Sequence, residues 1–212
     1  TQNQAFSALV FLFKHGLQQG LGDLSGTARA KKSRYVPPVL SRKEVDALIG
    51  NLRNPYKLMA QLMYGCGLRL SEAVSLRLKD LDLEGGMLTL RRGKGSKDRT
   101  IPLPQSITDS IEQQINRAVS MQEQDCAIGF DGVFMPDGYE VNKFNRQSRD
   151  LPWYWLFPAT RLTELKENGE MRRDHIHHTN LSREFREAAL RARILKRVTP
   201  HVLRHTFATH LL

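Results

Sequence analysis

The spacing of apolar residues changes near position 82, and this change limits the fold more than any other feature of the sequence. Over 41–76 the apolar residues recur every three to four positions, as they do in amphipathic helices. The pattern then becomes strand-like over 87–91, and a second strand-like run follows at 99–103 beyond a glycine-flanked turn. Pro102 has no N–H to donate to a neighbouring strand, so the second run belongs at a sheet edge. The sequence therefore predicts a mainly α-helical fold with a small antiparallel β-sheet.

Local signals divide the rest of the chain into helices and less regular regions. Ser41-x-x-Glu44 has the capping-box pattern that starts a helix, and Thr199-Pro200 supplies an N-cap residue followed by proline in the first turn. Residues 125–160 lack a clear period, and residues 161–180 form a polar stretch with several histidines. Helices are expected at residues 4–19, from 41, from 55 to 65, from about 71, at 105–124, at 181–193 and from 199 to the end of the chain.

The charge of the chain favours a polyanionic partner. Its 212 residues include 32 lysines and arginines against 22 acidic residues, a formal net charge of +10, and such an excess attracts nucleic acid. No apolar run approaches the roughly 20 residues that span a bilayer, and Thr1–Gln4 does not resemble a signal peptide. Cys66 and Cys126 lack CxxC spacing, which favours two ordinary thiols in a reducing cytoplasm over a disulfide or a zinc site. Because the first residue is not methionine, we expect the natural N-terminus to lie upstream.

A basic stretch separates two parts of the chain. Residues 1–28 contain one amphipathic helix followed by several glycines, and residues 29–39 form a basic linker that ends with two prolines. The linker is either a solvated tether or a strap that lies along DNA phosphates. Residues 40–212 form the main domain. The basic side chains of the linker include Lys31, Lys32 and Arg34.

Three short motifs contain side chains suited to phosphate chemistry. Arg69 lies just before a helix start, and Glu72 can pair with it and fix its guanidinium. Lys94 lies between two glycines at the hairpin tip, where it can reach outward and donate a proton. His201 and Arg204 are about 60° apart on the first turn of a helix, whose free N–H groups suit an anion. Each motif alone is also compatible with an ordinary surface salt bridge, turn lysine or helix start.

Together these side chains form a set for phosphoryl transfer. Two arginines can hold a phosphate bidentately and stabilise the charge on a pentacoordinate phosphorus, while the histidine and the lysine handle protons. Leu203, Phe207 and Leu211 lie on another face of the last helix and are expected to anchor it in the core. The sequence contains no evident cluster of metal-binding carboxylates, so the expected chemistry uses cationic side chains and no Mg²⁺.

The order of these motifs resembles that of the tyrosine recombinases, a family that includes the Xer proteins and the phage integrases. The motifs are Gly67-Leu68-Arg69-x-Ser71-Glu72, Gly93-Lys94-Gly95-x-Lys97-Asp98-Arg99 and Thr199-Pro200-His201-x-Leu203-Arg204-His205. The resemblance covers residues 41–212 and implies the DNA breaking-rejoining catalytic fold, with residues 1–28 as the end of a preceding core-binding domain. It also implies a 3′-phosphotyrosyl intermediate and no metal or other cofactor. The catalytic residues that it implies are Arg69, Lys94, His201 and Arg204.

The resemblance places the nucleophilic tyrosine of the family after the helix that contains His201 and Arg204. All five tyrosines of this chain precede His201, so none occupies the position of the nucleophile. We therefore expect the chain as given to bind DNA without cutting it, and we expect the nucleophile in a segment beyond Leu212. The five tyrosines are Tyr35, Tyr56, Tyr64, Tyr139 and Tyr154.

Residues 151–178 resemble an additional segment of the integron integrases, which recombine folded single-stranded attC hairpins and duplex attI sites. Aromatic side chains suit this substrate, because stacking with an extrahelical base is worth roughly 1–3 kcal/mol. One departure is Asp174-His175, where the family often has two histidines. The alternatives are that the tryptophans pack in the core and that His175, His177 and His178 bind a metal ion. The DNA-contacting residues expected in this segment are Trp153, Trp155, Arg172, Arg173 and His175.

The sequence thus leads to one main hypothesis and two others. The main hypothesis is a site-specific recombinase of integron-integrase type that assembles as a tetramer on DNA, in the bacterial cytoplasm and associated with the nucleoid. The first alternative is a Xer-type or phage-type recombinase that acts on duplex sites. The second is a DNA-binding module without catalysis.

Overall fold

The computed structural model describes residues 2–20, 22, 26, 37–91, 98–136, 146–166 and 168–212. Contacts divide the chain into two compact units, Thr1–Val36 and Pro37–Leu212. In the first unit, α1 spans Gln2–Phe11 and continues as a π-helical turn, η1, over Leu12–Gly16. This agrees with the helix expected at 4–19. Neither α1 nor η1 has a buried side chain within the described residues.

The second unit begins with three helices in the expected order. They are α2 (Arg42–Gly50), α3 (Tyr56–Gly65) and α4 (Leu70–Val74). The capping box predicted for α2 is present. The backbone N–H of Glu44 donates to Oγ of Ser41 at 3.2 Å, and the backbone N–H of Ser41 donates to Oε2 of Glu44 at 2.7 Å. This reciprocal pair satisfies two N–H groups that a helix start otherwise leaves without a partner.

A small antiparallel sheet with the strand order β1-β2-β3 follows these helices. The register of the predicted hairpin pairs Met87 with Pro102 and Leu90 with Arg99. β3 therefore lies at a sheet edge, as Pro102 predicted. The elements of this region are η2, a 3-10 turn at Leu78–Asp80, β1 (Leu81–Asp82), β2 (Met87–Leu90) and β3 (Arg99–Pro102).

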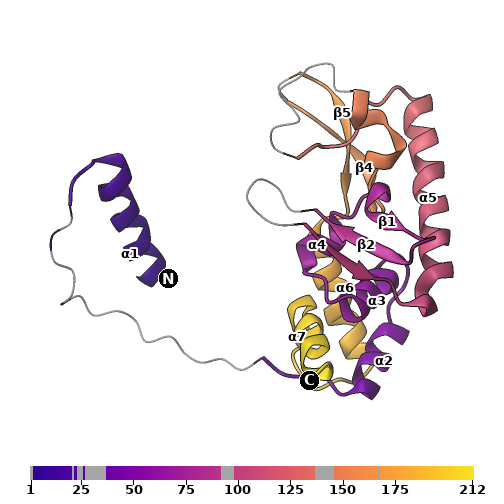
Figure 1. The fold of residues 1–212 in the computed structure, drawn as a ribbon, viewed down its shortest axis with the longest axis horizontal. Helices are drawn as coiled ribbons and strands as arrows, with labels where there is room; N and C mark the ends of the chain where they lie inside the picture. Colours follow the sequence, from indigo (N-terminus) through magenta and orange to yellow (C-terminus); the bar gives the residue numbers. More distant parts are fainter. Residues whose placement is uncertain are drawn as a thin grey trace. The chain divides into compact units, whose positions relative to one another are not determined.

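A long helix and a second hairpin complete one side of this unit. Figure 1 shows α5 extending from the level of the first sheet towards the β4–β5 hairpin. This hairpin is antiparallel and has an irregular register between Pro158 and Leu162. The elements are the 3-10 turn η3 (Gln105–Ile107), α5 (Thr108–Ala127), the 3-10 turns η4 (Arg146–Arg149) and η5 (Leu151–Trp153), β4 (Pro158–Glu164) and β5 (Met171–His175).

The second hairpin corrects the expectation of a less regular chain through this region. Strands were not predicted over 158–175 because Pro-Ala-Thr-Arg-Leu-Thr-Glu and Met-Arg-Arg-Asp-His do not alternate apolar with polar residues. The residues of β4 are mostly half-buried or exposed, so there is little apolar pattern to detect. Contacts with other elements, described below, fix this hairpin instead.

The last two helices are α6 (His178–Arg191) and α7 (Pro200–His210). Thr199 is the N-cap of α7 as predicted, since its Oγ1 accepts a hydrogen bond of 3.3 Å from the backbone N–H of Val202. Leu203 is buried and Phe207 is half-buried. The expectation for Leu211 is wrong, because this side chain is 70% exposed. It follows the last residue of α7, and the apolar face that packs in the core ends before it.

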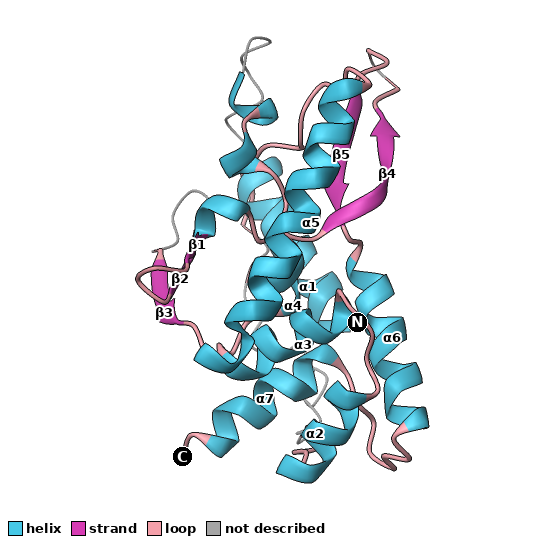
Figure 2. Ribbon diagram, turned by 90° about the vertical axis from the view of Figure 1, so that its right-hand side faces the viewer, coloured by secondary structure: helices cyan, strands magenta, loops and turns pink. Residues whose placement is uncertain are grey.

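Two hydrophobic clusters hold the second unit together. The larger cluster joins α2, α3, α4, α6, α7 and the first sheet. The smaller one joins α5 to the segments before β4, and it contains Phe130, Tyr154 and Trp155. Figure 2 shows the two small sheets as separate elements among the helices. None of the helices in the described ranges is long and apolar enough to cross a membrane.

Candidate active site

A cavity of about 770 Å³ opens beside the first turns of α4, α6 and α7, and we name it the arginine cavity. Its lining includes Arg69, His201 and Arg204. Three of the four predicted catalytic residues therefore lie at one site, although α4 and α7 are far apart in the sequence. The fourth, Lys94, lies outside the described residues.

Arg69 is positioned by Glu72, as the sequence suggested. The backbone N–H of Arg69 donates to Oε2 of Glu72 at 2.7 Å, and its Nη1 donates to Oε1 at 2.8 Å. Glu72 lies in the first turn of α4. One carboxylate thus caps the helix and orients the guanidinium that precedes it. The Arg69 side chain is still 47% exposed, which leaves it accessible to a ligand in the arginine cavity.

Arg204 reaches the same carboxylate from α7. Its Nη1 donates to the main-chain carbonyl of Gly67 and lies 3.6 Å from Oε2 of Glu72. Gly67 has a φ of +61°, and a side chain there would collide with the ring of Phe207. Glycine therefore allows α7 to approach the loop before α4. Burial, followed by the charge of Arg69, lowers the pKa of Arg204. An anion in the cavity would relieve this crowding of positive charge.

Arg99 joins the same group and was not predicted from the sequence. It is the first residue of β3, and its Nη2 donates to Oε2 of Glu72 at 2.8 Å. Three arginines from three elements therefore surround one carboxylate, which is only 12% exposed. The second sequence motif includes Arg99, but local sequence does not reveal that a strand residue meets α4.

Several histidines lie near the arginines. His175, His178 and His201 line the arginine cavity. The Nδ1 atom of His175 lies 2.9 Å from the main-chain carbonyl oxygen of Ile176. The side chain of His177 caps α6, because it accepts a hydrogen bond from the backbone N–H of Thr179. Among the described residues, no group of three or more His, Cys, Asp or Glu side chains is arranged to hold a metal ion.

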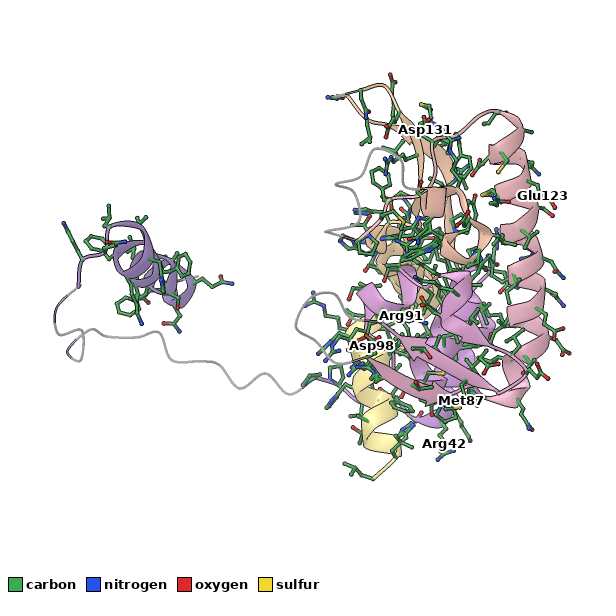
Figure 3. All side chains as sticks on the ribbon, turned by 45° about the horizontal axis from the view of Figure 1, so that its top comes forward. Arg42, Met87, Arg91, Asp98, Glu123 and Asp131 are labelled. Carbon is green, nitrogen blue, oxygen red and sulfur yellow. The ribbon has the colours of Figure 1, made fainter. Side chains whose placement is uncertain are left out.

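A second cavity, of about 650 Å³, shares His175 with the first, and we name it the aromatic cavity. Trp153, Trp155 and several charged side chains line it. Arg91 and Asp98 are among them, and Figure 3 shows these two residues near each other where β2 ends and β3 begins. Ser75 and His175 line both cavities, and His175 is thus a predicted base-contacting residue that lies beside the predicted catalytic residues.

Trp153 is half-buried at the aromatic cavity, and two cations approach its ring. Nζ of Lys79 lies 2.7 Å from the ring centroid, and Cζ of Arg77 lies 5.3 Å from it. Such cation–π contacts stabilise a ring in a fixed orientation. Burial lowers the pKa of Lys79 to about 8. An aromatic ring beside cationic groups suits a ligand that combines a flat base with a phosphate.

The burial of Trp155 and Arg173 disagrees with their predicted contact with DNA. Each residue is 5% exposed. Cζ of Arg77 lies 3.7 Å from the Trp155 ring centroid, and Nε1 of Trp155 donates to the main-chain carbonyl of Arg173. The Arg173 guanidinium forms a two-point contact with the carboxylate of Asp125. Side chains this buried offer little surface for base stacking or for a phosphate, and their contacts hold the second hairpin.

The other residues predicted to contact DNA differ in their exposure and in their neighbours. The Arg172 side chain is 18% exposed, and its Nη2 lies 2.8 Å from Oε2 of Glu170. The His175 side chain is 25% exposed and borders both named cavities. Lys31, Lys32 and Arg34 lie outside the described residues.

Two buried charged residues that the sequence did not single out join distant segments, Arg77 at the aromatic cavity and Asp125 at the second hairpin. Arg77 is 6% exposed and donates to the main-chain carbonyls of Trp153 at 2.6 Å and Phe134 at 2.7 Å. Burial lowers its pKa to about 10. Asp125, which is 2% exposed, accepts hydrogen bonds from Arg173 and from Oη of Tyr154 at 2.6 Å. Both residues link segments that are distant in the sequence, so only the folded chain reveals their partners.

Comparison with known proteins gives consistent matches over most of the chain. The Phage integrase family matches residues 38–212. An Escherichia coli protein named Integrase/recombinase is 41% identical over 212 residues, which are 100% of this chain and 63% of that protein. Tyrosine recombinase XerA from Pyrococcus furiosus is 32% identical over 216 residues, 99% of this chain and 59% of that protein. The chain thus spans less than two thirds of the length of these relatives.

Solved structures share the fold. XerH site-specific recombinase bound to its difH substrate has a TM-score of 0.58 and 20% identity, over 99% of this chain and 53% of that one. The crystal structure of XerA recombinase has a TM-score of 0.54 and 23% identity, over 98% of this chain and 60% of that one. At these identities the likeness concerns the fold, and it agrees with the mainly helical class with a small antiparallel sheet that the sequence predicted.

Proposed function

The chain belongs to the Phage integrase family, and from this membership we propose that the complete protein is a site-specific DNA recombinase of integron-integrase type. The observation that carries the proposal is the position of Arg69 and Arg204. They come from distant parts of the chain, contact the same carboxylate of Glu72 and line the same cavity. Two guanidiniums at one cavity suit a single phosphate group.

The proposed reaction is a transfer of the DNA phosphate to a tyrosine and back. Arg69 and Arg204 hold the scissile phosphate and stabilise the charge that develops on its oxygens. The tyrosine oxygen attacks phosphorus, a 3′-phosphotyrosyl bond forms, and the bond from phosphorus to the 5′ oxygen breaks. His201 takes up the tyrosine proton, and Lys94 donates a proton to the leaving 5′ oxygen. Attack by a 5′ hydroxyl of another strand reverses these steps, so no metal ion or high-energy cofactor is consumed.

The tyrosine is proposed to follow α7, in agreement with the family that the sequence resembles. Among the described residues, no tyrosine lines the arginine cavity. We further propose that residues 1–28 end a core-binding domain, that 29–39 are a basic linker along DNA, and that 40–212 belong to the catalytic domain. Cleavage is therefore tested with a longer protein that includes this tyrosine, which we call the extended protein.

The proposed substrates are folded single-stranded attC hairpins, with duplex attI as a partner site. Trp153 lies at the aromatic cavity, and His175 connects this cavity with the arginine cavity. An extrahelical base held by these two residues would therefore lie near the phosphate site. A base stacked within a duplex cannot reach such a ring. Further copies of the protein would complete a tetramer on the DNA in the bacterial cytoplasm, in association with the nucleoid.

A recombinase that acts on duplex sites is the second candidate. It is favoured by the relative named tyrosine recombinase XerA and by the similar fold of XerH bound to difH. Both candidates use the same catalytic residues and differ only in the DNA that they select. The aromatic cavity favours the folded substrate.

The discriminating experiment measures covalent protein–DNA complexes that survive denaturation. The substrates are a folded attC strand, the same strand with its extrahelical bases deleted, and the corresponding duplex. More covalent complex on the folded strand supports the integron type, and equal or greater amounts on the duplex support the second candidate. The absence of a covalent complex with every substrate contradicts the proposed recombinase activity.

A further inference from the structure

Donors from three elements surround one oxygen of Glu72. Oε2 accepts hydrogen bonds from the backbone N–H of Arg69 at 2.7 Å and from Nη2 of Arg99 at 2.8 Å. Nη1 of Arg204 lies farther away, at 3.6 Å from the same oxygen. Arg99, and not Arg204, therefore makes the direct contact with Oε2.

The position of Arg99 is fixed by the first sheet. It begins β3, and its backbone pairs with Leu90 of β2, which is 4% exposed. The Arg99 side chain is 32% exposed. Within the described residues, Arg99 is not part of the lining of the arginine cavity. Its influence on that cavity therefore passes through Glu72, which it contacts directly.

We propose that Arg99 is a positioning residue that keeps Arg204 available to the scissile phosphate by occupying the nearest oxygen of Glu72. The inference rests on the proposed function. Without Arg99, a shift of Nη1 of Arg204 from 3.6 Å to about 2.8 Å would form a direct ion pair with Glu72. Each guanidinium N–H that turns to Glu72 is lost to the phosphate.

The charges around Arg204 agree with this role. The pKa of Arg204 is lowered first by burial, then by Arg69, while Glu72 opposes these effects and Arg99 adds to them. Arg99 is thus close enough to act on Arg204 electrostatically. It repels the Arg204 guanidinium and at the same time partly neutralises the carboxylate that attracts it. Both effects keep the Arg204 guanidinium turned towards the arginine cavity.

A double-mutant cycle in the extended protein tests the inference. Arg99→Met should lower the kcat of strand cleavage by about tenfold, less than the 10²–10³ lost when a whole transition-state donor is removed. The Kd for DNA should rise by no more than about tenfold, the loss expected for one phosphate contact, and Arg99→Lys should retain most of the rate because it still occupies Oε2. In a Glu72→Gln background, Arg99→Met should have little further effect, because the competing carboxylate is gone.

Two results would overturn the inference. One is a fall in the kcat of cleavage on Arg99→Met that is equally large in the Glu72→Gln background, because Arg99 would then act on DNA directly. The other is a wild-type rate in Arg99→Met when its melting temperature is unchanged.

A second measurement does not depend on cleavage. In the present chain, the guanidinium NMR signal of Arg204 is followed during titration with inorganic phosphate. Arg99→Met should raise the Kd for inorganic phosphate about tenfold. Arg99→Lys should keep most of the wild-type affinity. An unchanged affinity in Arg99→Met contradicts the positioning role. If the extended wild-type protein fails to cleave DNA but Arg99→Met still weakens phosphate binding, the proposed function fails, and the part that stands is that Arg99 keeps Arg204 available to a phosphate.

Discussion

The indole Nε1 of Trp155 donates a hydrogen bond of 3.0 Å to the main-chain carbonyl of Arg173. This bond joins the segment before β4 to β5. The ring of His175 lies edge-on to Trp155 at a centroid distance of 5.0 Å. Trp155 therefore supports His175 from the interior, while Trp153, two positions earlier, is half-buried at the aromatic cavity. Replacing each tryptophan in turn therefore separates an effect on protein stability from an effect on DNA recognition.

Trp153→Ala should weaken binding to a hairpin with extrahelical bases by roughly 1–3 kcal/mol and barely affect a hairpin without them. Its melting temperature should fall less than that of Trp155→Ala, because the Trp153 ring is only half-buried. The matched change, Trp155→Ala, should lower the free energy of unfolding by about 3–5 kcal/mol and weaken both hairpins alike. Binding assays and thermal unfolding measure the two effects. Equal losses on both hairpins with a lowered melting temperature in Trp153→Ala would falsify the stacking role.

Asp125→Asn should destabilise the protein by about 3–5 kcal/mol, because it leaves the charge of Arg173 buried without its counter-ion. Arg173 and Asp125 are 5% and 2% exposed. The control is Glu187→Gln, which removes an exposed ion pair with Arg191 at 3.8 Å and should cost less than about 0.5 kcal/mol. Chemical denaturation measures both. A similar, small effect of the two changes would mean that the buried pair does not hold the second hairpin.

Arg204→Lys should abolish most strand cleavage in the extended protein and retain DNA binding. Lysine preserves the charge but cannot contact a phosphate through two parallel N–H groups. Cleavage assays and DNA-binding measurements on the same preparation separate the two properties. Full cleavage by this variant would show that Arg204 does not hold the scissile phosphate.

Lys94→Ala should be inactive on ordinary DNA and active on DNA with a 5′-bridging sulfur at the scissile position. A thiolate leaves without much help from a proton donor, so the loss of a general acid matters less for that substrate. The ratio of the variant's cleavage rate to the wild-type rate, measured on ordinary DNA and on the sulfur-containing DNA, tests whether Lys94 is the general acid. An equally low rate of the variant on the sulfur substrate would assign Lys94 a different task.

The affinity of the chain for DNA should fall steeply with salt concentration. Each neutralised phosphate contributes about −0.9 to the slope of log K against log salt for a duplex. Replacing Lys31, Lys32 and Arg34 together by alanine should make the slope shallower if the linker lies along DNA. A flat dependence between low and physiological ionic strength contradicts electrostatic binding, and an unchanged slope in the triple variant contradicts the linker's contact with DNA.

Local signals were sufficient for most helices and for the first hairpin. The capping box at Ser41 and Glu44, the N-cap at Thr199 and the change of period before β2 each act within a few residues, so the printed sequence contains them completely. The pairing of Arg69 with Glu72 was predictable for the same reason, since the two residues are adjacent on one helical turn.

The remaining features of the fold and of the candidate site depend on contacts between distant segments, which exist only in the folded chain. The sequence identified Arg69 and Arg204 and placed both at helix starts. It did not show that Arg99 meets them at Glu72, or that Arg173 turns inward to Asp125 and is buried. The β4–β5 hairpin was hidden for the same physical reason. A buried ion pair and a hydrogen bond from Trp155 hold it, and these depend on which segments pack together after folding, not on the spacing of residues along the chain.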